Sequence, residues 1–405
     1  MYIKEEVGMR KTLFIFVLGI FLIALLISFG CSKKPESAAS VEVIDGIEYV
    51  HNAETPLHPE KSVTFEEELS VGGEAYEMLS RPMNVVVDKD GRIFLSDVQD
   101  QTIKVFDPHG EFIRSIGGKG EGPGEFTYLG YLTFLPDGRL MVMDSMAMRL
   151  SLFDPEGTFL VSYHWTQRPS RPLYATDSSC VMMEYVFGEG DDALADRKLF
   201  VKKYDFEGKE ILSYGEFLAE EMKIHREARA GGGGVMFGIS VPHSPHSLFA
   251  ADQASERLYH CINDEYMIEV FDGDGKVIRR FDRPYEPLPF TSEDAEEFRS
   301  RYTERASESM KKMVRGMAMP SVKTISSQML VDDKGNLWIE TYEKKEEEGK
   351  DFTAYDIFDS EGYYEAKVWV DLKPRLFANG RMYRFHSDEE TGYMMVKRYR
   401  VVWNE

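Results

Sequence analysis

One short pattern recurs along this 405-residue chain: an aromatic residue, aspartate, two variable residues and glycine. Such a turn between apolar segments predicts a β-hairpin. The copies lie at residues 105–110, 152–157, 203–208, 270–275 and 357–362. Another hairpin, which turns at Asp and Gly or at Asn and Gly, precedes most copies. We call this preceding hairpin the first hairpin of its unit and the copies above the second hairpins. The clear versions of the first hairpin lie at 87–91, 135–138, 332–335 and 377–380, and its weaker versions at 177–178 and 252–253. Two hairpins every ~40–50 residues predict four-stranded propeller blades.

The two kinds of hairpin occur a different number of times, and this difference predicts how the ring closes. The sequence contains six first hairpins but five second ones. Residues 63–73 share the pattern of the outer strand at 112–118, so they can supply the strand that the sixth blade lacks. We therefore predict an all-β fold over residues 47–405, a six-bladed β-propeller of four-stranded blades. The N-terminal strand closes this ring and leaves no sheet edge open.

The first blade also resembles a known repeat. Residues 81–126, RPMNVVVDKDGRIFLSDVQDQTIKVFDPHGEFIRSIGGKGEGPGEF, are similar to an NHL repeat. Nearly all of the chain after residue 47 resembles the bacterial six-bladed β-propeller lipoproteins, most closely over the first two blades. The resemblance implies the fold and little about chemistry, because propellers serve both binding and catalysis.

The glycine-rich segment at 116–126 could be a phosphate-binding loop or a structural joint. A phosphate loop requires a helix whose first amides face the anion. Here Pro123 and Phe126 lead into another strand instead. We interpret the segment as a joint between the first two blades, with Phe126 packed between them.

The N-terminus predicts export and anchoring. Basic residues at 10–11 precede an apolar run at 13–27 and then Cys31. This order is typical of a lipoprotein signal peptide over residues 1–30, with Cys31 lipidated and residues 31–46 as a flexible tether. An uncleaved membrane anchor is the alternative. Both interpretations place the folded part in the cell envelope, outside the cytoplasm and attached to a membrane.

Charge and cysteine content exclude several classes of protein. The formal net charge is −22, which argues against nucleic acid as a partner. Only Cys180 and Cys261 follow Cys31, so the chain is not a disulfide scaffold. These two residues could form one disulfide bond or remain as buried thiols.

The long insertions fall on one face of the predicted ring. In an antiparallel blade, the second turn and the crossing to the next blade lie on the same face, and long loops there usually mark the working side. We predict a mostly helical insertion at 287–322 between blades four and five. Its helix, over 292–315, begins with a capping box at Thr291 and Asp294. It could form a lid over the central funnel or pack against the propeller. A shorter helix is predicted over 216–230.

The hairpin register also predicts a ring of polar residues. The position seven residues before each first-hairpin glycine falls where an innermost strand begins. These positions, with near-equivalents in the third and fourth blades, are Asn84, Tyr131, Arg171, His246, Gln328 and Lys373. They could bind a ligand in a water-filled funnel or could be solvated strand ends.

Motifs for nucleophilic or metal-dependent catalysis do not occur in the sequence. It contains no GxSxG, HExxH or CxxC, and its one close histidine pair, His243 and His246, is interrupted by proline. Some NHL-type propellers are metal-dependent lyases with central histidines, and gluconolactonase-like propellers bind calcium. The ring supplies only His246 for the first pattern and Asn84 for the second. No cofactor is assigned, although Ca²⁺ or Zn²⁺ stays open.

These observations favour a lipid-anchored binding or scaffold module for a protein, peptide or carbohydrate-like ligand at the long-loop face. A hydrolase or lyase working in the central funnel is the alternative.

Overall fold

The computed structural model describes residues 39–73, 79–166, 171–188, 196–228, 234–304 and 306–404, which belong to one compact unit. The apolar run at 13–27 and Cys31, on which the lipoprotein prediction depends, lie outside the described residues. Within the described residues, no helix is long and apolar enough to cross a membrane.

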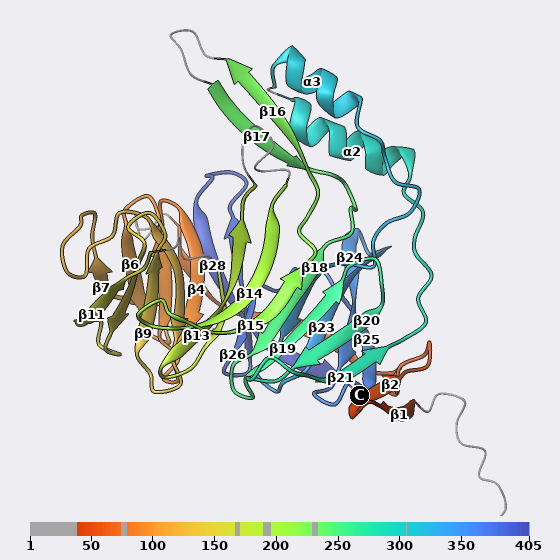
Figure 1. The fold of residues 1–405 in the computed structure, drawn as a ribbon, viewed down its shortest axis with the longest axis horizontal. Helices are drawn as coiled ribbons and strands as arrows, with labels where there is room; N and C mark the ends of the chain where they lie inside the picture. The colour runs from red at the N-terminus through yellow and green to blue at the C-terminus, as the bar shows by residue number, and fades with distance from the viewer. Residues whose placement is uncertain are drawn as a thin grey trace, which may run out of the picture. The chain divides into compact units, whose positions relative to one another are not determined.

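Six blades of four antiparallel strands dominate the described chain (Figure 1). Five blades are separate four-stranded sheets, and blade four is part of a six-stranded sheet. Blades one and two are β4 (Pro82–Val87), β5 (Ile93–Asp97), β6 (Thr102–Phe106) and β7 (Phe112–Gly117), then β8 (Leu129–Phe134), β9 (Leu140–Asp144), β10 (Arg149–Phe153) and β11 (Phe159–His164). Blades three and four are β12 (Pro172–Ala175), β13 (Ser179–Val186), β14 (Lys198–Asp205) and β15 (Glu210–Phe217), then β18 (Ser247–Asp252), β19 (Arg257–Ile262), β20 (Met267–Phe271) and β21 (Val277–Asp282). Blades five and six are β22 (Ser326–Val331), β23 (Leu337–Glu347), β24 (Lys350–Phe358) and β25 (Tyr364–Val370), then β26 (Leu376–Ala378), β27 (Arg381–Ser387), β28 (Met394–Asn404) and β3 (Ser62–Gly72).

The ring closes as the sequence predicts. Strand β3 pairs with β28 from Ser62 opposite Asn404 to Gly72 opposite Met395, so the last blade combines both ends of the folded chain. The first strands of blades one to five also contact one another in order, and β26 contacts β4. The all-β, six-bladed architecture is therefore confirmed.

The recurring aspartate and glycine pattern has a local cause. In the second hairpin of blade one, Oδ1 of Asp107 accepts hydrogen bonds from the main-chain N–H groups of His109 (2.8 Å) and Glu111 (2.9 Å). Gly110 follows with φ of 87°, a left-handed conformation that favours glycine. Because each turn is stabilised by its own residues, the same pattern marks each second hairpin. Equivalent aspartates are Asp154, Asp205, Asp272 and Asp359.

The glycine-rich segment after β7 is the joint that the sequence predicts. The main-chain N–H of Phe126 donates to the carbonyl of Gly118 at 2.7 Å, so the chain folds back on itself. The Phe126 ring is fully buried and packs with residues of blades one and two. A side chain at Gly117, where φ is 78°, would overlap with this ring.

An N-terminal segment ties three blades together in a way that the sequence analysis did not predict. Strands β1 (Ser40–Ile44) and β2 (Ile47–His51) form a hairpin, and β2 pairs in parallel with β21. Strand β1 thus lies within residues 31–46, which the sequence predicts to be a flexible tether. Asn52 then donates to the carbonyl of Gly362 at 2.8 Å and accepts from the N–H of Tyr364 at 2.8 Å, before the chain continues into β3. Blades four, five and six are linked through this one segment.

Two insertions pack against each other at one end of the propeller (Figure 1). One is the hairpin of β16 (Met222–Ala228) and β17 (Gly234–Ser240), so the helix predicted over 216–230 is wrong. The other contains α2 (Ser292–Thr303) and α3 (Glu308–Arg315) in place of one predicted helix. The predicted helix is divided in two because Ser307 has an extended backbone and caps the N-terminus of α3. The predicted capping box at Thr291 and Asp294 is confirmed.

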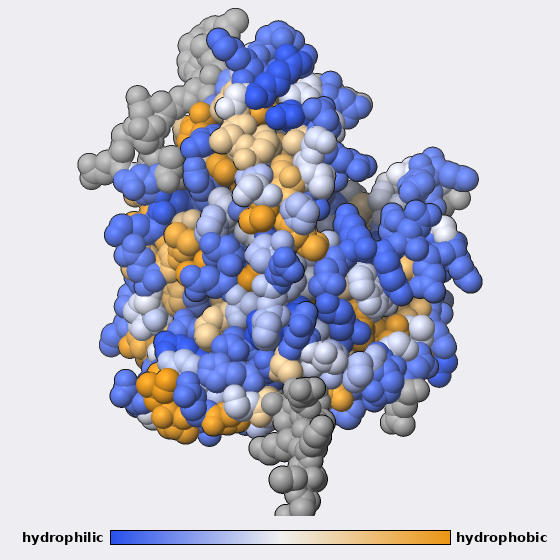
Figure 2. Space-filling model, turned by 90° about the vertical axis from the view of Figure 1, so that its right-hand side faces the viewer, coloured by the Kyte–Doolittle hydropathy of each residue, from blue (hydrophilic) through white to orange (hydrophobic). Residues whose placement is uncertain are grey.

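The hairpin and the helices share a small hydrophobic core. Its buried members are Ile239 on β17, Val314 on α3 and Met317, with Phe298 and Met313 packed around them. Figure 2 shows hydrophobic side chains at this end of the molecule, below a hydrophilic tip. No described residue of α2 or α3 lines the central cavity, so the methionines pack against the inserted hairpin and do not form a lid.

Candidate functional site

A cavity of about 560 Å³ lies where the first strands of the blades converge. Residues on or next to β4, β8, β12, β18, β22 and β26 line it, together with residues of β13 and β14. The volume falls in the range of small-molecule sites, which is about 300–1,000 Å³. Leu218 and Glu220, in the long connection after β15, also line the cavity. The cavity therefore lies towards the face on which the sequence predicts the long loops.

Five of the six residues predicted from the hairpin register meet at this cavity. Asn84 on β4, Tyr131 on β8 and Gln328 on β22 hold the same position relative to the end of their strands. Arg171 directly precedes β12, and His246 directly precedes β18. All five line the cavity. The register argument thus predicts where these side chains lie, whereas ligand binding by them is a proposal made below.

Lys373 is the exception, because it does not line the cavity. Its Nζ lies 2.8 Å from Oε2 of Glu340, and more than half of its side chain is exposed. The error comes from turn length. Strands β26 and β27 are joined by two residues, whereas five residues join β4 and β5. Counted from the last paired residue of the strand, the counterpart of Asn84 is Arg375, which does line the cavity.

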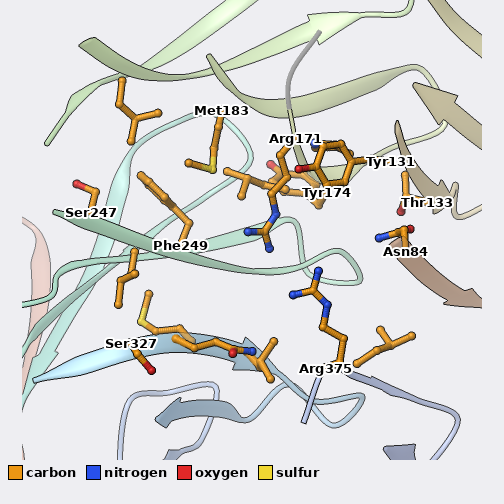
Figure 3. A pocket seen from close by; sticks show the side chains of 18 of the residues that line it. Asn84, Tyr131, Thr133, Arg171, Tyr174, Met183, Ser247, Phe249, Ser327 and Arg375 are labelled. Carbon is orange, nitrogen blue, oxygen red and sulfur yellow. The ribbon is translucent and has the colours of Figure 1, made fainter. Parts of the chain in front are cut away.

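Two guanidinium groups face each other in the cavity (Figure 3). Arg171 enters from blade three and Arg375 from blade six. Both residues are solvent-exposed, since they project into an open cavity. The pKa of Arg171 is lowered, first because the surrounding protein displaces water and further because Arg375 carries the same charge, although Tyr131 and Tyr185 act in the opposite direction. Within the described residues, neither arginine has a carboxylate partner.

The Asn84 side chain adds a third hydrogen-bond donor. Its Oδ1 accepts the main-chain N–H of Leu132 at 3.2 Å, which ties β4 to β8. The amide nitrogen consequently points the other way, into the cavity and towards the two arginines (Figure 3). Donors from blades one, three and six therefore face a common space.

Glu220 is the one carboxylate among the described residues that line the cavity. Nη2 of Arg197 lies 3.8 Å from its Oε2 and donates to its main-chain carbonyl at 3.0 Å. The cation that contacts Glu220 is therefore Arg197, and the structure pairs Glu220 with neither Arg171 nor Arg375.

The remaining wall is aromatic and apolar, with fixed polar groups. Tyr131 and Tyr185 are half-buried and line the cavity. Behind them Tyr174 and Phe249 are buried, and the Tyr174 hydroxyl hydrogen-bonds to that of Tyr214 at 2.8 Å. His246 is oriented by its Nδ1, which donates to the carbonyl of Ser244 at 2.9 Å. A wall of this kind gives a ligand both flat apolar contact and oriented hydrogen bonds.

Other candidate chemistry lies elsewhere in the fold. In the part of the chain that the structure describes, no group of three or more His, Cys, Asp or Glu residues could hold a metal ion. Cys180 and Cys261 are free and buried in different core clusters. Burial raises the pKa of each thiol to about 12. Of the two alternatives that the sequence leaves open, the structure shows buried thiols.

Comparisons with known proteins agree with this fold. A family described as 6-bladed beta-propeller matches residues 77–163, which cover most of blades one and two. A member of the DUF4221 family from Bacteroides vulgatus superposes with a TM-score of 0.51 at 12% identity, covering 84% of this chain and 99% of that one. A protein of Bacteroides fragilis described as exported gives 0.49 at 11% identity, with 88% and 100% covered. Virginiamycin B lyase from Staphylococcus aureus gives 0.37 at 12% identity, with 84% and 99% covered. No curated protein sequence matches the chain.

At these identities structural similarity shows the fold alone. The fold and the central cavity define the class of protein: a six-bladed β-propeller with a solvent-accessible polar site on its axis.

Proposed function

We propose that this chain is an exported, lipid-anchored propeller that binds a polar, carbohydrate- or peptide-like ligand in its central cavity. One observation carries the proposal. Polar side chains from separate blades, at matching register positions, project into one solvent-accessible cavity. The propeller itself makes the first strands converge, and it is the polar character of these side chains that favours a ligand site over a packed core.

The composition of the cavity supports this ligand class. Tyr131 and Tyr185, which are half-buried, offer aromatic surface from two neighbouring blades. Aromatic rings pack against the apolar faces of sugars and side chains, while amide and guanidinium groups fix the polar substituents. Asn84 and Gln328 approach from other blades, so an extended ligand could be held at several points at once.

Export and anchoring are proposed from the sequence of residues 9–31. Their test is metabolic labelling of the producing bacterium with a radioactive fatty acid. Label is expected on the wild-type protein and absent from the variant Cys31→Ala. An unlabelled wild-type protein that stays in the membrane would instead support the uncleaved anchor.

The binding proposal is tested with the full-length protein purified in detergent and applied to immobilised oligosaccharides and peptides. A ligand retained by the wild type is expected to be lost by the triple variant Asn84→Ala, Tyr131→Ala and Gln328→Ala. The control is Tyr393→Ala, which removes an exposed tyrosine that does not line the cavity. Equal retention of every ligand by the wild type and the triple variant would contradict the proposal.

A further inference from the structure

The two arginines in the cavity lack the carboxylate partners that most described arginines of this protein have. Arg92, Arg279, Arg280 and Arg283 each pair with at least one carboxylate. Arg171 and Arg375 have none among the described residues and face each other instead (Figure 3). In a chain with a formal net charge of −22, carboxylates are abundant, so this arrangement is not explained by a shortage of acids.

Two like charges in a partly desolvated cavity repel each other and destabilise the unliganded protein. The one acid among the described lining residues, Glu220, lies 3.8 Å from Arg197 instead. Because no described carboxylate pairs with Arg171 or Arg375, negative charge that arrives with a ligand would stabilise them. Unfavourable arrangements of this kind are concentrated at functional sites.

We infer that the central cavity recognises an oxyanion, a carboxylate, sulfate or phosphate group of the ligand, held between Arg171 and Arg375. This inference rests on the proposed function, because it concerns the same cavity. Each guanidinium can donate two parallel hydrogen bonds to an oxyanion, and the Asn84 amide donates a further one.

The same geometry selects against neutral ligands. A neutral analogue would displace water from both guanidinium groups without supplying charge, and buried polar groups left unpaired lower affinity strongly. The acidic surface repels anions elsewhere on the molecule, so weak nonspecific binding of anions to other sites is suppressed.

The test uses the purified full-length protein and three probes, which are sodium sulfate, sodium phosphate and sodium acetate. Each is compared with sodium chloride at equal ionic strength by calorimetric titration and thermal unfolding. At least one oxyanion is expected to bind the wild type and raise its unfolding temperature. Arg171→Gln and Arg375→Gln are each expected to weaken that binding at least tenfold. The probe that binds best identifies the oxyanion.

The matched control is Arg301→Gln on α2, which removes an exposed arginine that pairs with Glu297. It is expected to bind the oxyanion as the wild type does. Arg171→Lys keeps the charge but loses the paired hydrogen bonds, and an intermediate affinity is expected. Since neither cavity arginine has a described partner to lose, both glutamine variants are expected to fold, and their unfolding temperatures in chloride check this.

The inference and the proposed function fail in different ways. No oxyanion binding by the wild type, or binding that both glutamine variants retain, would overturn the inference. If an immobilised ligand needs Asn84 and Tyr131 but neither arginine, the cavity is still the site and the oxyanion inference is wrong. If an oxyanion needs both arginines while no oligosaccharide or peptide binds, the inference is supported and the proposed ligand class is wrong.

Discussion

Replacing Asp356 by alanine is expected to destabilise the propeller strongly, although the residue lies away from the central cavity. The carboxylate, on β24, is completely buried and accepts hydrogen bonds from Nε of Arg283 (3.0 Å) and from the hydroxyl groups of Tyr266 (2.5 Å) and Tyr364 (2.6 Å). The Arg283 guanidinium lies against the rings of Tyr266, Tyr364 and Tyr285, at 4.6–5.2 Å. Arg283 follows blade four, so this cluster joins blades four and five.

The size of this loss in the free energy of unfolding follows from the groups that the substitution leaves buried without a partner. The Arg283 side chain is 4% exposed and would lose its counter-charge, and two tyrosine hydroxyls would lose their acceptor. Breaking a buried ion pair from one side costs about 3–5 kcal/mol. We therefore expect Asp356→Ala to lower the free energy of unfolding by about 4 kcal/mol. Asp356→Asn keeps an acceptor oxygen and is expected to be less harmful.

Denaturant unfolding followed by tryptophan fluorescence measures this loss. The control is Glu297→Ala, which breaks an exposed helix pair with Arg301 and is expected to cost about 0.5 kcal/mol or less. The double variant Asp356→Ala and Arg283→Met is expected to lose much less than the sum of the single variants. Strict additivity, or a loss below about 1 kcal/mol for Asp356→Ala, would refute the argument.

Three further outcomes are expected. Gly117→Ala is expected to cost about 1–3 kcal/mol in denaturant unfolding, because φ is positive and the methyl group would overlap with a buried phenylalanine ring, whereas Gly118→Ala, into open space, should be nearly neutral. Two carboxylates that hydrogen-bond to His51 raise its pKa above the ordinary 6.5. Protonated His51 thus stabilises the β2–β21 contact fully below pH 6.5 and loses this effect as the pH rises through the raised pKa. The protection factors of the β2 amides, which are corrected for the intrinsic pH dependence of exchange, should fall over that range in the wild type but not in His51→Gln. In the Cys31→Ala variant, Cys180 and Cys261 should react with a thiol reagent at pH 8 only after unfolding, and rapid reaction of this variant in its native state would contradict their burial.

The propeller can be predicted from the sequence because its signals are local. Each second-hairpin aspartate caps its own turn, as Asp107 does, so the same residues recur wherever the same turn is needed. The closing strand is predictable for a related reason. Residues 63–73 carry the pattern of an outer strand, and only one position in the ring lacks a strand.

The insertions are less predictable because tertiary pairing decides their structure. Residues 222–228 contain good helix formers, but they pair with residues 234–240 as a hairpin. Helix propensity is a weak preference that such pairing overrides. The interruption between α2 and α3 depends on Ser307, which acts as an N-cap inside a continuous apolar pattern.

The cavity shows both the strength and the limit of register arguments. Counting from turn glycines identifies Asn84, Tyr131 and Gln328, because their hairpins have the same length. It selects Lys373 in place of Arg375, because the Asn379-Gly380 turn is two residues long. That dipeptide is a strong signal for such a turn, so the sequence contained the means to place Arg375 correctly. Glu220 enters from a long connection, for which register gives no information.

A crystal structure of the protein with its retained ligand would test the central claim most directly. We predict density in the central cavity, with an oxyanion of the ligand within hydrogen-bond distance of the guanidinium groups of Arg171 and Arg375 and of the Asn84 amide nitrogen. A ligand bound instead on the outer strands, or on the surface of β16, β17, α2 and α3, with the cavity unoccupied, would contradict the claim.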